Sequence, residues 1–237
     1  MRTKLLSNST KLEKGTGSGY LTAGMYLAPS TGYVEDGANL CPWASDGCSL
    51  ACLAHESGRM VFDSVQQAQT KRRELFLSDL DAFMEQLGKE LKAHIRKASK
   101  LGLTPCFRPN ASSDIDWVAL GLVDRFPDLQ MYDYTKNPAR MKRDLPANYH
   151  LTFSRSESNH RVAIKLLASG KNVAVPFHPT LPEQWEGFPV FDGDQTDLRF
   201  TDPKYGDAGV KTGFVIGLKA KGSKAKSDKS GFVIHTN

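Results

Sequence analysis

Residues 149–177 read YHLTFSRSESNHRVAIKLLASGKNVAVPF, and this stretch decides the expected fold. It holds an apolar run at Tyr149–Ser154, a helical pattern at Ser158–Ser169 and a second apolar run at Asn172–Phe177. Two strands joined by one helix over short connections indicate a βαβ unit with parallel strands. Right-handed crossovers wind such units into either an open sheet or a barrel.

The alternation of strands and helices continues on both sides of this unit. We expect further strands at Tyr20–Ala28, Thr104–Arg108, Leu129–Tyr134, Phe188–Asp192, Gly213–Lys219 and Gly231–His235. Between the central strands we expect helices at Asp114–Arg125 and Asn137–Arg143. The pattern predicts an α/β protein.

Two longer helices precede the central strands. Ser78 and Asp79 can cap one of them, its apolar residues recur at three- and four-residue spacing from Leu80 onward, and Gly102 ends it. An earlier helix spans roughly Ser64–Leu77. On the exposed side of this earlier helix we place Lys71, Arg72 and Arg73.

The composition of the 237-residue chain, 40% hydrophobic and 24% charged, is typical of a globular protein. The formal charge of +5 belongs to the ends, because residues 1–14 carry +3, residues 219–230 carry +4 and the rest carries −2. This distribution argues against a uniformly basic nucleic-acid-binding body, although the ends could still contact phosphates. We expect a single α/β domain over 1–237, with mobile basic segments at 1–14 and 219–230.

The cellular location is predicted from two missing patterns. No apolar stretch approaches the ~20 residues needed to cross a bilayer, and the first residues lack the apolar segment of a signal peptide. We therefore expect a cytoplasmic protein without membrane contact. In a reducing cytosol, the four cysteines suit metal or redox chemistry better than disulfides.

Three of the four cysteines lie close together, in the segment CPWASDGCSLAC at residues 41–52. Cys41, Cys48 and Cys52 have the spacing C-x6-C-x3-C. Three thiolates this close suit a [4Fe–4S] cluster, because thiolate sulfur is a strong ligand for such clusters and for soft metals. With three protein ligands, one iron would stay open to a small-molecule ligand.

Zinc is the alternative metal, because Cys41, Cys48, Cys52 and the nearby His55 resemble a compact Cys₃His zinc set. Buried or incidental thiols are a third interpretation. Cys106 lies inside an expected strand, where most buried cysteines act as small apolar residues; the alternative role is that of a fourth ligand.

Polar residues follow the ends of consecutive expected strands. In a parallel sheet these ends share one edge, where α/β proteins place their sites. We predict Asn110, Ser113, Tyr134 and Ser154 as cofactor-binding residues and Asp114, Lys136 and His178 as catalytic residues. Structural alternatives are open for these residues, as helix caps, a hydrogen-bonded loop histidine or a solvated strand end.

The segment DGDQTDLRFTD at residues 192–202 gathers four aspartates around Arg199. It suits a turn held by Asx hydrogen bonds and an Arg–Asp pair, or a divalent-cation site, although the spacing is not that of an EF-hand. The cation interpretation predicts a metal-dependent hydrolase such as a nuclease.

Several motifs resemble an uncharacterised family of bacteriophage-encoded proteins. They are CPWAS-x-GC-x3-C and the strings FRPNASSDIDW, MYDYTK, YHLTFSRSES, NVAVPF, FDGDQTDLRFTDP and VIGLKAKG. The resemblance extends from about Lys11 to the C-terminus. It implies a phage origin and the cytoplasm of an infected host cell.

A more distant resemblance is to the radical S-adenosylmethionine enzymes. The shared order is a strand, a three-cysteine loop, a long helix and then alternating strands and helices. The resemblance implies a TIM-like partial (β/α) barrel of about six parallel strands with an N-terminal cysteine loop. It also implies a [4Fe–4S] cluster and S-adenosylmethionine as a ligand. The cysteine spacing departs from the C-x3-C-x2-C of that superfamily.

The leading hypothesis is a phage-encoded iron–sulfur protein that performs radical or redox chemistry on a small molecule at the open cluster iron. The alternative is a zinc or iron–sulfur module that binds nucleic acid or a host protein through its basic ends, without catalysis.

Overall fold

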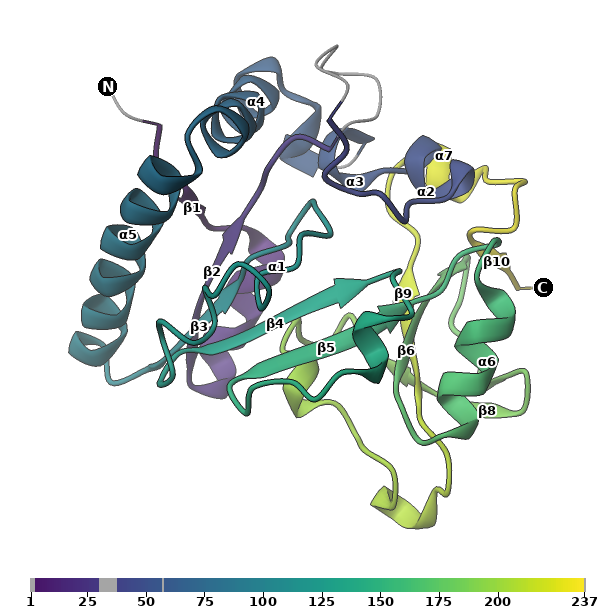
Figure 1. Ribbon diagram of the computed structural model, residues 1–237. Coiled ribbons are helices and arrows are strands. Elements are labelled where there is room, and N and C mark those ends of the chain that lie inside the picture. The colour runs from purple at the N-terminus through teal and green to yellow at the C-terminus, as the bar shows by residue number, and fades with distance from the viewer. Residues whose placement is uncertain (1–2, 30–37, 57, 237) are drawn as a thin grey trace. The chain divides into compact units, whose positions relative to one another are not determined.

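The computed structural model describes residues 3–29, 38–56 and 58–236 (Figure 1). It contains a mixed, mostly parallel sheet of ten strands together with helices, so the predicted α/β class is confirmed. The chain forms two compact units. The first comprises Met1–Pro42, Arg59–Asp133 and Leu145–His150, and the second comprises Trp43–Gly58, Tyr134–Asp144 and Leu151–Asn237. The single domain expected over 1–237 stays a prediction.

The strands of the first unit are β1 (Leu6–Ser7), β2 (Tyr20–Met25), β3 (Thr104–Arg108) and β4 (Gln130–Thr135), and the last two residues of β4 belong to the second unit. β1 pairs antiparallel with β2, whereas β2, β3 and β4 pair in parallel in that order. Short helical turns in the N-terminal part of the chain are α1 (Thr10–Glu13), η1 (Lys14–Ser18) and η2 (Gly58–Val61).

Helix α5 (Leu80–Lys100) begins and ends where its sequence predicts. Asp79 Oδ1 accepts the Ala82 N–H at 2.9 Å, and Gly102 with a φ of 66° follows the last turn. The helix contacts β1, β2 and β3 (Figure 1), and the residues that its spacing places on one face are buried: Phe83, Met84, Leu87 and Leu91. Within the described residues no helix, α5 included, is long and apolar enough to cross a membrane.

Helix α4 (Asp63–Ser78) is confirmed, but the expected exposure of its arginines is wrong. Arg72 and Arg73 are buried. Arg72 Nε donates to the Lys4 carbonyl oxygen at 2.7 Å, and Arg73 Nη1 donates to the Ala28 carbonyl oxygen at 2.9 Å. These acceptors satisfy the guanidinium groups inside the first unit, although burial lowers the pKa of Arg72.

The strands of the second unit are β5 (Tyr149–Ser154), whose first two residues belong to the first unit, β6 (Val173–His178), β7 (Gln184–Trp185), β8 (Phe188–Asp192), β9 (Val215–Lys219) and β10 (Ile234–His235). Their order is β5-β6-β9-β8-β7, with β10 also paired to β6, and only the β7–β8 pair is antiparallel. Helix α6 (His160–Ala168) joins β5 to β6, which confirms the predicted βαβ unit.

The remaining helices are short: α2 (Asp46–Leu50), α3 (Leu53–Glu56), α7 (Ser223–Lys226), η3 (Arg140–Lys142), η4 (Arg199–Thr201) and η5 (Asp207–Gly209). The helices expected at 114–125 and 137–143 are wrong, because the first range forms turns and the second only η3. Gly121 has a φ of 69°, which interrupts a helix. Asn137 Oδ1 accepts the Ala139 N–H at 2.9 Å and favours a local turn instead.

Candidate functional site

The cysteine segment, residues 45–56, carries two of the three clustered cysteines and lies in the second unit. Ser45 caps α2, with its Oγ accepting the Cys48 N–H at 3.3 Å. Cys52 follows one turn later, and its carbonyl oxygen accepts the Glu56 N–H at 3.0 Å in α3. Cys48 and Cys52 are thus held by one short, continuous piece of backbone.

Glu157, from the loop between β5 and α6, fixes the start of the cysteine segment. Its Oε1 accepts the Gly47 N–H and its Oε2 accepts the Ser45 hydroxyl, both at 2.8 Å. The first N–H groups of a helix have no partner within the helix, so a carboxylate here satisfies one of them. Hydrogen bonds to an ionised group are also stronger than neutral ones. Glu157 is therefore a positioning residue for α2.

Gly47 allows the cysteine segment to approach the C-terminal part of the chain closely. A Cβ at this position would lie 2.1 Å from Ser230 Oγ and 2.6 Å from Phe232 Cβ, which is too close for non-bonded atoms. On the same segment, Ala51 is buried in a cluster with Ala225 of α7 and Val233. Only a residue without a side chain fits at position 47.

Burial controls the protonation of Cys52. It raises the pKa of this thiol to about 11, and the neighbouring Cys48 and Glu56 act in the same direction. A hydrogen bond from the Ala54 N–H and the positive charge of Lys136 oppose the rise. Cys52 is therefore a neutral thiol near pH 7, and a thiolate-binding metal has to displace its proton.

Lys136 and Ser154, which the sequence assigns to one pocket, lie together in the second unit. Lys136 follows β4, and its Nζ donates to Oγ of Ser154 at the end of β5 at 2.8 Å. The same ammonium lies 5.4 Å from the centre of the Phe232 ring, within cation–π distance. Together with the charge interaction between Lys136 and Cys52, these contacts gather an ammonium, a hydroxyl and thiols in one region.

Cys41 belongs to the first unit, where its Sγ lies 3.7 Å from the Ser112 carbonyl oxygen. No disulfide joins the four cysteines, all of which lie in the described residues, and Cys106 is buried in β3 as expected of a small apolar residue. The side chain of His55 lies outside the described part of the chain. In that described part, no three His, Cys, Asp or Glu side chains gather as ligands of one metal ion. The cluster and the zinc set stay predictions.

Asn110 and Ser113 form a buried network after β3 in the first unit. Asn110 Oδ1 accepts three hydrogen bonds, from Ser113 Oγ at 2.8 Å, the Ile115 N–H at 3.0 Å and Trp117 Nε1 at 2.9 Å. The amide oxygen thereby fixes the path of the loop.

Asp133 completes this network from β4 and was missed by the sequence analysis. Its fully buried carboxylate accepts the Asn110 N–H at 2.7 Å, Asn110 Nδ2 at 2.9 Å and the Tyr149 hydroxyl at 2.9 Å. A single aspartate inside a strand, such as Asp133, has no sequence pattern that reveals these partners.

Asp114, predicted as a catalytic residue, also lies in the loop after β3. Its N–H donates to the Leu40 carbonyl oxygen at 2.8 Å.

Tyr134 and His178 have different surroundings. Tyr134 packs against an apolar cluster of Ala174, Phe214 and Ile216. His178 ends β6, and its ring centre lies 5.7 Å from that of His235 in β10. The structure therefore gives His178 a second histidine as its neighbour, which the sequence analysis did not predict.

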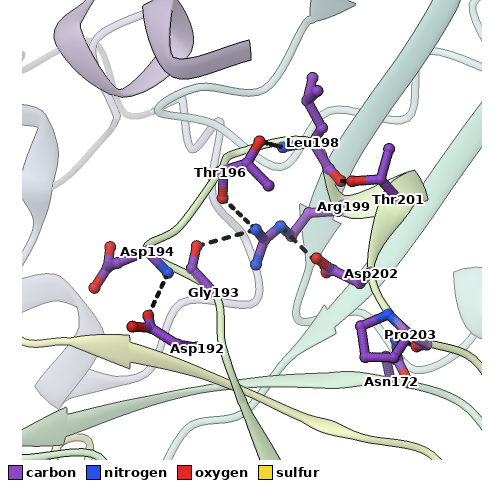
Figure 2. A network of polar contacts seen from close by, with 10 residues as sticks. All are labelled: Asn172, Asp192, Gly193, Asp194, Thr196, Leu198, Arg199, Thr201, Asp202 and Pro203. Atoms are coloured by element: carbon purple, nitrogen blue, oxygen red, sulfur yellow. Dashed lines mark hydrogen bonds and ion pairs between the residues drawn. The ribbon is translucent and has the colours of Figure 1, made fainter. Parts of the chain in front are cut away.

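The acidic segment 192–202 is closed by Arg199. Figure 2 shows its guanidinium directed at the Gly193 carbonyl oxygen, 3.0 Å from Nη2, and at the Asp202 carboxylate, 3.3 Å from Nε. Arg199 and Asp202 are both buried. Asp192 Oδ1 accepts the Asp194 N–H at 2.9 Å. These contacts confirm the turn held by an Asx bond and an Arg–Asp pair.

The basic segment 219–230 contains helix α7 and two ion-paired lysines. Lys221 Nζ lies 2.9 Å from Asp194 Oδ1, and Lys224 Nζ lies 2.7 Å from Glu56 Oε1. These ion pairs offset part of the positive charge that the sequence analysis assigned to a nucleic-acid or host-protein surface. That partner stays a prediction.

A family model described as gene product 88 (GP88) matches residues 2–236. The chain belongs to the GP88 family. The match includes the cysteine segment, Glu157 and the C-terminal residues that contact them, and it confirms the phage-type family predicted from the motifs. No curated protein and no solved structure matches this GP88 chain.

Proposed function

We propose that this GP88 protein is a phage-encoded iron–sulfur protein whose [4Fe–4S] cluster is held by the thiolates of Cys41, Cys48 and Cys52. The cysteine segment carries the proposal: Glu157 fixes its start, and it holds two free thiols about one helical turn apart. Such outer contacts orient metal ligands and hold them in place. Cys41 joins the set through its sequence position, seven residues before Cys48.

The chemistry of the two thiols supports a metal-bound form. Cys48 and Cys52 are half-buried, which limits solvent access to a metal bound between them. The positive charge of Lys136 favours the thiolate form of Cys52, against the effect of burial. A [4Fe–4S] cluster with three protein ligands supplies electrons and one open iron position for a small molecule.

Lys136 and Ser154 are the proposed binding groups for that small molecule. The ammonium of Lys136 would hold an anionic group, and its hydrogen bond with Ser154 keeps it in place. S-adenosylmethionine, which carries a carboxylate, is the molecule that the distant resemblance suggests. The partial (β/α) barrel belongs to the same proposal, as do the lining residues chosen from the sequence: Asn110, Ser113, Asp114, Tyr134 and His178.

Anaerobic purification of the full chain tests the proposal, with an absorption spectrum and analysis of iron, sulfide and zinc. We expect a brown protein with broad absorption near ~400 nm and stoichiometric iron and sulfide. Colourless protein with stoichiometric zinc would overturn the iron–sulfur assignment in favour of the Cys₃His set. Protein without either metal would overturn both assignments.

Single alanine variants identify the ligands. Cys41→Ala, Cys48→Ala and Cys52→Ala should each lose the cluster iron. Cys106→Ala is the matched control, because it removes a buried thiol from β3 and should keep the iron. Full iron retention in the three variants would overturn the proposal.

A further inference from the structure

Two histidines lie side by side at the C-terminal ends of β6 and β10. The strands pair in parallel, with His235 opposite His178. The ring centres are 5.7 Å apart, and the ring planes make an angle of 89°. Two imidazoles bound to one metal ion through nitrogen at about 2.0–2.1 Å have ring centres roughly 5–6 Å apart. The observed spacing therefore suits a shared metal ion.

A hydrogen bond prepares His235 as a ligand. Its Nε2 lies 2.8 Å from the Asp228 carbonyl oxygen. A carbonyl oxygen only accepts, so in the neutral ring Nε2 carries the hydrogen and Nδ1 carries the lone pair. Metal-binding histidines almost always donate their other ring N–H to an acceptor of this kind. The ring of His178 forms no hydrogen bond with the residues that the structure describes, so its nitrogen lone pair is not engaged there.

Backbone contacts hold the two rings in register. The Thr236 N–H donates to the His178 carbonyl oxygen at 2.8 Å, and Thr236 Oγ1 donates to the same oxygen at 3.3 Å. Thr236 Oγ1 also lies 3.1 Å from Thr180 Oγ1, so the chain beyond each histidine is tied to the other strand. His178 is half-buried and His235 is exposed, which leaves room for water or a ligand in further coordination positions.

We propose that His178 and His235 together bind a divalent transition-metal ion, with water in the remaining positions. Imidazole nitrogen suits zinc, copper and nickel, which distinguishes this site from the thiolates of the cysteine segment. The inference rests on imidazole rather than thiolate ligands and needs no cluster; His178, which the proposed function counts among the lining residues of the small-molecule pocket, is here a metal ligand.

Calorimetric titration of the full chain, without an affinity tag, with nickel(II) tests this site. The parent should bind nickel, and His178→Gln and His235→Gln should each weaken that binding. Removing a group that hydrogen-bonds to a metal ligand typically lowers metal affinity roughly 10–100-fold, and removing the ligand itself should lower it at least as much. The matched control is His160→Gln, which changes a half-buried histidine 3.8 Å from Glu186 and should bind nickel like the parent.

A Cys48→Ala/Cys52→Ala double variant separates the two sites. It should keep the nickel affinity of the parent, and the complex should show no thiolate-to-nickel absorption. Absence of nickel binding in the parent, unchanged affinity in both histidine variants, or loss of binding in the cysteine double variant would each overturn the proposal. Circular dichroism of every variant checks that the fold is kept.

Discussion

Removing the Glu157 carboxylate should open the start of α2 while the rest of the protein stays folded. Glu157→Ala deletes hydrogen bonds of 2.8 Å to Gly47 and Ser45. Each hydrogen bond to a charged group contributes about 1.5–3 kcal/mol, and the low end applies to this part-buried pair, which gives about 3 kcal/mol in all. At about 1.4 kcal/mol per tenfold, local opening of α2 should become roughly 100-fold more frequent.

Amide hydrogen exchange measures this opening. The Ser49 N–H donates to the Ser45 carbonyl oxygen at 2.9 Å and the Ala51 N–H to the Gly47 carbonyl oxygen at 3.0 Å, so a peptide covering 45–52 reports on α2. Hydrogen exchange of this peptide should accelerate by roughly 100-fold, provided that exchange occurs through local opening of α2.

Glu157→Gln is the control for the charge of the carboxylate. Glu157→Gln keeps the shape and one acceptor oxygen but loses the charge, so its effect should be smaller, roughly tenfold. Exchange in β3, which belongs to the first unit, should be unchanged in both variants. Exchange of the 45–52 peptide within about twofold of the parent in Glu157→Ala would refute the positioning role.

Two further predictions concern stability, measured by urea denaturation. Gly47→Ala should lower the free energy of unfolding by about 1–3 kcal/mol, because the new Cβ would overlap Ser230 Oγ. Gly17→Ala is the control: open space surrounds this residue, so the free energy of unfolding should change by less than about 0.5 kcal/mol. Equal losses in the two variants would contradict the close approach at Gly47. Burial lowers the pKa of His94, although hydrogen bonds to the backbone of Cys106 and Leu21 oppose this. The unfolded chain therefore takes up a proton first as the pH falls below about 6.5, and stability should drop there. His94→Gln should lose this part of the pH dependence, and an unchanged slope would count against it.

The fold was predictable where the pattern of a single segment decides it. β3, β5 and β8 occupy the predicted residues, and α4 extends one residue beyond the prediction at each end. Strand alternation and three- and four-residue helical spacing are local properties, so a short stretch is enough to show them.

The errors arose where polar side chains find partners that the pattern does not contain. Asn110 Oδ1 binds the Ile115 N–H and so holds a turn where a helix was expected. Arg72 and Arg73 were placed outward because they are charged, but carbonyl acceptors from distant segments draw them inward. Charge alone predicts exposure only when no such acceptors lie nearby.

For the candidate site, the sequence predicted the chemical groups but not what holds them. The cysteine spacing is a local pattern, and strand order placed Lys136 and Ser154 in one pocket lining, but their hydrogen bond was not predicted. Glu157 lies 110 residues beyond Gly47, and no single-sequence pattern links the two. The histidine pair could not be predicted for the same reason, because His178 and His235 become neighbours only when β10 pairs with β6.

Residues 228–233, just before β10, connect the cysteine segment with Lys136 in the second unit. Ser230 and Phe232 lie against Gly47, and the Phe232 ring also lies beneath the ammonium of Lys136. Arg155 Nη1 donates to the Phe232 carbonyl oxygen at 3.0 Å, and the Asp228 carboxylate accepts the Val233 N–H at 3.0 Å. Because Gly47 and Phe232 make these contacts, a substitution at Gly47, next to Cys48, or at Phe232, far along the chain from the cysteines, should change the surroundings of the thiols. The surroundings of the cysteine segment therefore depend on residues 228–233, just before β10, as well as on the cysteines themselves.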